Sequence, residues 1–79
     1  MTGSTASRLA GRWVVDNDSL DAIELNVLVS WVRERADAYC RKFKRAQCSD
    51  IACDVANALV ITSTQAWRLC ELAQPVGWA

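Results

Sequence analysis

Apolar residues recur at helical spacing through the middle of the chain, from about Leu20 to about Ala46, a stretch without Gly or Pro. They fall on two stripes with the period of an α-helix. The first stripe comprises Leu20, Ile23, Val27, Trp31, Tyr39 and Phe43, and the second comprises Leu25, Val29, Val32, Ala36 and Cys40. We therefore predict one long helix over 20–46. One stripe can face the core of the domain, and the other needs a second cover, for which a partner chain is the simplest choice.

Two shorter helices are predicted after the long one. Ser49 can accept a hydrogen bond from the first amides of a helix over about 50–58. Thr62 and Gln65 have the spacing of a capping box, in which each side chain bonds the other residue's backbone amide. This pair predicts the start of a third helix over 63–73.

The N-terminal part of the chain has a different character. Residues 1–10 are small and polar, which is typical of a mobile tail. Residues 12–15 have strand-forming side chains and could pair with 76–79. We therefore expect 1–15 to be a flexible tail with a possible short strand, and 16–79 to be a single helical domain. The predicted fold class is all-α, a small three-helix domain in which a long first helix precedes a helix-turn-helix.

The net charge is zero, with nine cations against nine anions, but the charges are unevenly placed. Asp16, Asp18, Asp21 and Glu24 form an acidic block, whereas residues 33–45 carry six cations against two anions. A polarised molecule of this kind can present one face to phosphates without a basic total charge. The same run also fits the solvated face of a helix, in which Glu34, Asp37 and Arg41 make weak pairs.

The chain has 79 residues and four tryptophans. A domain this small is marginal alone, and large rings bury much area per residue. We expect Trp67 to pack in the core. The N-terminal sequence is unlike a secretory signal, and no run of apolar residues is long enough to span a membrane. These features predict a cytoplasmic protein that makes no membrane contact.

The segment 54–69, which opens Asp-Val-Ala, resembles the helix-turn-helix of bacterial and phage repressors, including the lactose-repressor family. In that family the opening is followed by a small-residue turn, an aliphatic residue with Ser or Thr, and a helix with Arg near its middle. The apolar places of the pattern are taken here by Val55, Ala56, Leu59, Ile61, Ala66 and Leu69. The resemblance implies a helix-turn-helix over 49–74, with Ala56 where the two helices cross.

The resemblance also implies a site on double-stranded DNA. Helix 63–73 would enter the major groove with Ser63, Thr64, Gln65 and Arg68 exposed. Gln can bond two atoms of adenine and Arg two atoms of guanine. Sequence-independent contacts to phosphate would come from Arg41, Lys42, Lys44 and Arg45. The expected function is a small transcriptional regulator of phage or mobile-element type, acting as a homodimer through the apolar long helix.

Val60 departs from the repressor pattern, since the family usually has Gly there. Gly suits that position because the chain takes a positive φ, which a β-branched residue resists. The same residues also fit an ordinary helical hairpin packed on the long helix. The alternative function is then a small protein-interaction module, or a phage-encoded inhibitor of a host protein. Zero net charge and uncovered apolar surface favour this alternative.

The four cysteines invite a zinc or disulfide interpretation. Cys40, Cys48, Cys53 and Cys70 include no pair separated by two residues, and the chain has no His. Structural zinc sites usually have such closely spaced ligands, so we interpret these residues mainly as small apolar side chains. Without His there is also no obvious base to activate a cysteine nucleophile. We expect no enzymatic activity, no cofactor and no metal.

Overall fold

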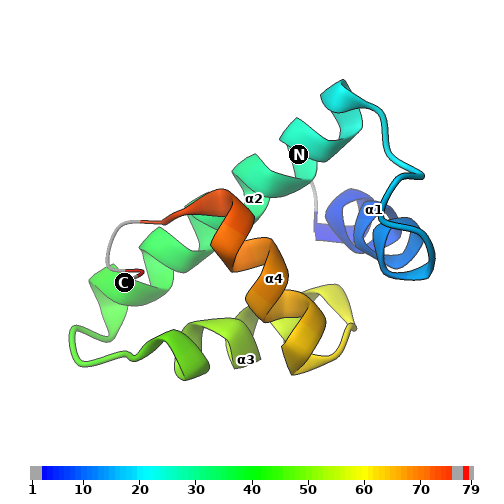
Figure 1. The fold of residues 1–79 in the computed structure, drawn as a ribbon. Helices are drawn as coiled ribbons and strands as arrows, with labels where there is room; N and C mark the ends of the chain where they lie inside the picture. Colours follow the sequence, from blue (N-terminus) through cyan, green and yellow to red (C-terminus); the bar gives the residue numbers. More distant parts are fainter. Residues whose placement is uncertain (1–2, 76–77, 79) are drawn as a thin grey trace.

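The computed structural model describes residues 3–75 and 78, and its secondary structure consists of four α-helices. They are α1 (Gly3–Val15), α2 (Ala22–Lys42), α3 (Cys48–Leu59) and α4 (Ser63–Ala73). The longest helix, α2, runs along one side of the molecule, and the other three helices all pack against the same side of α2 (Figure 1). The described part of the chain contains no strand, so the all-α class is confirmed and the expected three helices become four. No helix in this part is long and apolar enough to cross a membrane.

Helix α1 corrects the prediction for the N-terminal part of the chain. Residues 3–15, expected as a tail with a strand at 12–15, form thirteen residues of α-helix. The physical reason is burial, because Ala6, Leu9, Ala10 and Trp13 lie on one helical stripe and are at most 6% exposed. Packing of that stripe outweighs the strand propensity of three residues. The proposed strand partner, residues 76–79, lies largely outside the described residues.

Helix α2 begins at Ala22 and ends at Lys42, inside the predicted limits of 20 and 46. Its start is set by a capping box. The Glu24 amide donates to Asp21 Oδ1 at 2.7 Å, and the Asp21 amide donates to Glu24 Oε1 at 3.3 Å. These two bonds satisfy amides that have no partner within the helix, and the acidic residues also suit the positive end of the helix dipole.

Burial shows which residues of the two apolar stripes of α2 face the core. Val32 and Ala36 of the second stripe are fully buried, together with Leu28, against residues from the other three helices. The first stripe divides, because Leu20 is buried whereas Ile23 is 77% exposed. Val27, Trp31 and Tyr39 of the first stripe also pack against the core, so both stripes contribute to it, and Ile23 and Phe43 are the exposed members of the first stripe. The face of α2 that carries Ile23 is uncovered.

Candidate functional site

The α3–α4 connection consists of three residues, Val60 to Thr62. Val60 lies in the left-handed region, with φ 59° and ψ 49°, and its amide donates to the Ala56 carbonyl. The Ile61 amide donates to the same oxygen at 3.0 Å, which closes the end of α3. Thr62 then begins α4, since its Oγ1 accepts from the Gln65 amide at 3.2 Å. Val60 thus has a positive φ, at the position where the repressor pattern has Gly.

Contacts on both sides of the turn hold this strained conformation. Ala56 is 4% exposed and Leu59 is 1% exposed, so the turn is anchored in the core. The Ser7 hydroxyl of α1 donates to the Leu59 carbonyl at 3.0 Å and satisfies an oxygen of the last helical turn. The side chain of Val60 is 84% exposed and contributes little. The backbone shape therefore comes from the neighbours of Val60 rather than from Val60 itself.

The predicted base-reading residues divide into two groups. Ser63 and Thr64 are exposed at the N-terminus of α4. Gln65 is half-buried, and its Oε1 is buried without a hydrogen-bond partner in the described structure. The Thr62 half of the expected capping box is present. The side-chain oxygen of Gln65, by contrast, is not exposed on the surface.

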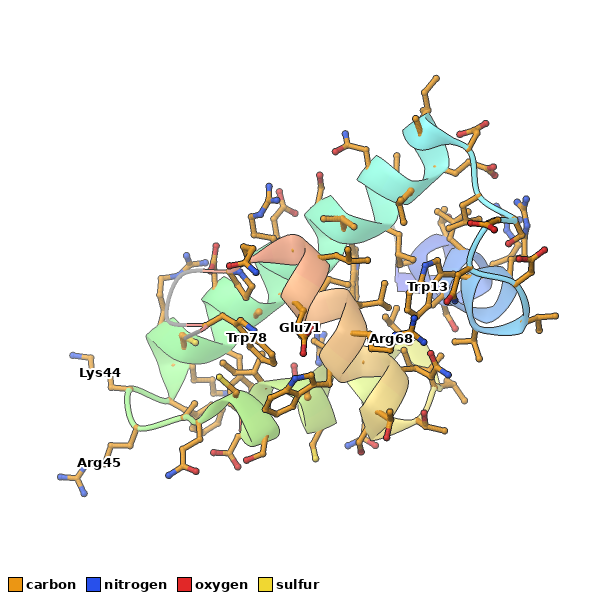
Figure 2. The ribbon with its side chains drawn as sticks, in the orientation of Figure 1. Trp13, Lys44, Arg45, Arg68, Glu71 and Trp78 are labelled. Carbon is orange, nitrogen blue, oxygen red and sulfur yellow. The ribbon has the colours of Figure 1, made fainter. Side chains whose placement is uncertain are left out.

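Arg68 is exposed but engaged with the segment that joins α1 to α2. Its Nη2 donates to Asn17 Oδ1 at 3.1 Å, and its guanidinium carbon lies 5.5 Å from the ring centroid of Trp13 (Figure 2). Asn17 in turn donates to the Trp13 carbonyl at 2.7 Å. Arg68 thus clamps α4 to α1, and it must leave these partners before it can contact a base.

The predicted phosphate-binding cations lie together at the other end of α3. They are exposed at the end of α2 and in the loop that follows it, and they are Arg41, Lys42, Lys44 and Arg45. Lys44 and Arg45 project outward from this loop (Figure 2). The twelve residues of α3, about 18 Å of helix, separate the loop from Ser63 and Thr64. The structure therefore presents two patches rather than one continuous surface.

Two other cations of the run 33–45 serve the fold. Arg33 Nε donates to the Ala73 carbonyl at 2.7 Å and satisfies an oxygen at the end of α4. Arg35 forms an ion pair with Asp54 of α3 at 2.9 Å. The basic surface is therefore smaller than the sequence suggests.

A groove on the exposed side of α4 was not predicted. It measures about 600 Å³ and is lined by Trp13, Trp67, Arg68, Glu71, Leu72, Gln74 and Trp78. Trp67, expected in the core, is 38% exposed, and its ring centroid lies 4.8 Å from that of Trp78 in an edge-to-face contact. The spacing of Trp67 and Glu71 already places them on one face of a helix, but nothing in that spacing reveals whether the face is outward.

The cysteines are free thiols in different surroundings. Burial raises the pKa of the Cys70 thiol to about 12, with a smaller contribution from Cys48. Burial also raises the pKa of Cys40, assisted by Asp37 and Cys48. Cys53 is exposed. No group of three or more Cys, Asp or Glu residues in the described chain is arranged to hold a metal ion.

Comparisons of the chain with protein-family models, with curated proteins and with solved structures find no match.

Proposed function

We propose that this protein is a small regulator that binds double-stranded DNA, with α4 as the helix that enters the major groove. The observation that carries the proposal is the left-handed Val60 in the α3–α4 turn. A β-branched residue adopts this conformation only where its surroundings demand it. Here the surroundings are two packed helices joined by a short turn, and the repressor resemblance implies such a turn.

The N-terminus of α4 provides the base-reading end. The free amides of a helix N-terminus favour phosphate, and short hydroxyl side chains beside them can bond phosphate or a base edge. Ser63 and Thr64 are exposed at this end. Arg68 joins them only after it leaves Asn17 and Trp13, so we expect it to contribute less to recognition than the hydroxyl pair.

The cations of the α2–α3 loop provide affinity that does not depend on sequence. The major groove is about 12 Å wide and α3 is about 18 Å long, so we expect Lys44 and Arg45, at the far end of α3, to contact the backbone beside the groove that α4 occupies. Glu71 and the zero net charge oppose binding. We therefore expect affinity that is modest and depends steeply on salt.

The test is titration of a fluorescent mixed-sequence duplex at several salt concentrations, followed by selection of preferred sequences from a random library. The double variant Lys44→Ala/Arg45→Ala should reduce the slope of log K against log salt by about 2, since each phosphate contact contributes about 0.9. The matched control Arg8→Gln removes an exposed cation of α1 and should leave the slope unchanged. Ser63→Ala/Thr64→Ala should reduce discrimination among sequences. No binding to any duplex at low salt would refute the proposal.

A second candidate function is binding of a partner protein in the tryptophan groove of α4. Trp67 is 38% exposed in this groove and contacts the half-buried Trp78, and Trp residues are frequent anchors of protein interfaces. Capture of one dominant host protein that persists at high salt would support it. That capture should be lost in Trp67→Ala and retained in Lys44→Ala/Arg45→Ala, the opposite of the pattern expected for DNA.

A further inference from the structure

An aromatic pair, Tyr39 and Phe43, lies at the C-terminal end of α2. The two ring centroids are 4.7 Å apart, and the ring planes are tilted by 42°. Tyr39 is half-buried and packs against the core, whereas Phe43 is 47% exposed. The amide of Phe43 donates to the Tyr39 carbonyl and fixes the backbone that carries the exposed ring. The pair is therefore an aromatic platform, with one ring anchored against the core and the other at the surface.

Two grooves meet at the aromatic platform. The first measures about 470 Å³, and its lining extends along α2 from Trp31 to Phe43. The second measures about 410 Å³ and is lined by the platform, by the loop that follows α2 and by Asp50 of α3. Both volumes lie within the range of small-molecule clefts, about 300–1,000 Å³. A planar group can therefore enter either groove and contact an aromatic ring.

The side chains around the exposed ring are cationic. Lys42 lines the first groove, and its Nζ lies 5.4 Å from the centroid of Phe43. Lys44 and Arg45 line the second groove. All three cations are exposed, and Arg41 adds a fourth exposed cation at the end of α2. A negatively charged group that reaches the platform therefore has a cation in each of the two grooves.

The acidic residues of the two grooves are engaged or distant. Asp54 forms an ion pair with Arg35, and the carboxylate of Asp50 accepts a backbone amide at the start of α3. Glu34 lies nine residues before Phe43, which is about 13 Å along the helix. The surface around the exposed ring therefore keeps its positive charge.

We propose that the aromatic platform binds an unpaired base of single-stranded nucleic acid. The base stacks on Phe43, and the phosphates on its two sides are held by Lys42 and by the pair Lys44 and Arg45. Lys42 leaves the ring and turns to a phosphate, which its exposed and flexible side chain permits. Aromatic rings that stack on bases and a cationic path for the backbone are the two elements of single-strand binding. An apolar helix of another protein would leave three cations without partners, so charge complementarity favours nucleic acid.

This site is distinct from duplex binding by α4. In a duplex each base is stacked between its neighbours and presents only its edges in the grooves, so no base face is available to Phe43. Lys44 and Arg45 can contact phosphate in either case, whereas the Phe43 ring serves only the single strand. The inference therefore does not rest on the proposed regulator function, and variants of Phe43 test it separately.

Fluorescence anisotropy of labelled strands of about ten nucleotides measures this binding to the full chain at low salt. The strands are oligothymidylate, oligouridylate and an abasic DNA strand of the same length, which keeps the phosphates and lacks the bases. At least one pyrimidine strand should bind at least about fivefold more tightly than the abasic strand, since a stacked base contributes that factor or more. Phe43→Ala should remove this preference, and Phe43→Tyr, which keeps an aromatic ring, should retain it.

The matched control is Ile23→Ala, which truncates an apolar side chain at the other end of α2 that is 77% exposed. It should leave every affinity unchanged, and circular dichroism checks that all variants remain folded. Phe43→Ala should bind a mixed-sequence duplex as tightly as the unmodified chain does. Equal binding of pyrimidine and abasic strands, an undiminished preference in Phe43→Ala, or an equal loss of duplex affinity in that variant would each overturn the proposal.

Discussion

The substitution Val60→Gly tests the physical account of the α3–α4 turn. An L-residue in the left-handed region costs about 1–2 kcal/mol, and a β-branched side chain belongs at the upper end of that range. Val60 has φ 59° and ψ 49° there. Gly has no side chain to clash in this region, so the substitution removes the strain.

Two smaller effects oppose the relief of strain. The Val60 side chain is 84% exposed, so its removal forfeits only about 0.3 kcal/mol of burial. The greater freedom of Gly in the unfolded chain costs a further 0.5–1 kcal/mol, roughly. From about 2 kcal/mol of strain, a net stabilisation of about 1 kcal/mol remains, which corresponds to a rise in Tm of about 4–8 °C for a domain of this size.

Thermal and urea denaturation followed by helical circular dichroism measure this change. Ala38→Gly is the matched control, because it places Gly at an exposed position in the right-handed backbone of α2. It should lower the free energy of unfolding by about 1 kcal/mol, the opposite sign. An unchanged urea m-value would show that the unfolding reaction is the same. If Val60→Gly were as destabilising as the control, the strain argument would be refuted.

Two further predictions concern a helix cap and a buried thiol. Asp21→Ala removes the capping box of α2 and should cost about 1–2 kcal/mol in urea denaturation, whereas Asp18→Ala should change stability by less than about 0.5 kcal/mol. For Cys70, the folded pKa of about 12 lies above the ordinary value of 9.0, so the unfolded chain loses its proton first as pH rises. The contribution of Cys70 to the free energy of unfolding is therefore complete below pH 9 and should fall by about 1.4 kcal/mol by pH 10. Cys70→Ala should abolish this loss. At pH 8 alkylation should modify the exposed Cys53 before Cys70, and rapid labelling of Cys70 in the folded protein would contradict this assignment.

Periodicity and capping chemistry predicted most of the helical structure. The third helix, expected over 63–73, has those limits in the structure, because Thr62 caps its own amides and Pro75 follows its end. The second helix extends beyond the predicted 50–58 to Cys48–Leu59, and here the predicted cap was wrong. Ser49 lies inside the helix, and the N-cap is Gln47, whose amide bonds the Asp50 carboxylate at 2.9 Å. These signals act within a few residues, so they can be recognised in sequence.

Helix α1 was missed for a related reason. The spacing of Ala6, Leu9, Ala10 and Trp13 is helical, but the flanking Thr, Ser and Gly are typical of a tail and residues 12–15 favour a strand. Local preferences therefore disagreed along this segment. Helices α2 and α3 bury the apolar stripe of α1, and this packing favours the helix over the strand.

The candidate site depended still more on the tertiary structure. The repressor resemblance implied exposed hydroxyls at Ser63 and Thr64, and both are exposed. Lys44 and Arg45, expected within the long helix, lie instead in the loop before α3 and are exposed. The partner of Arg68 lies 51 residues away, and no local pattern identifies Asn17 as that partner. The exposure of Trp67 and the burial of the Gln65 carbonyl also depend on packing around α4.

The sequence by itself determined the helical class, the limits of α4 and the position of the α3–α4 turn, because caps and periodic apolar residues act over a few positions. Whether the turn could take a left-handed residue at Val60 was decided only by the tertiary structure. Burial of Ala56 and Leu59 and the hydrogen bond from Ser7, 52 residues from Leu59, over-determine the backbone there. The long-range contacts of the fold therefore hold a conformation that the local sequence disfavours.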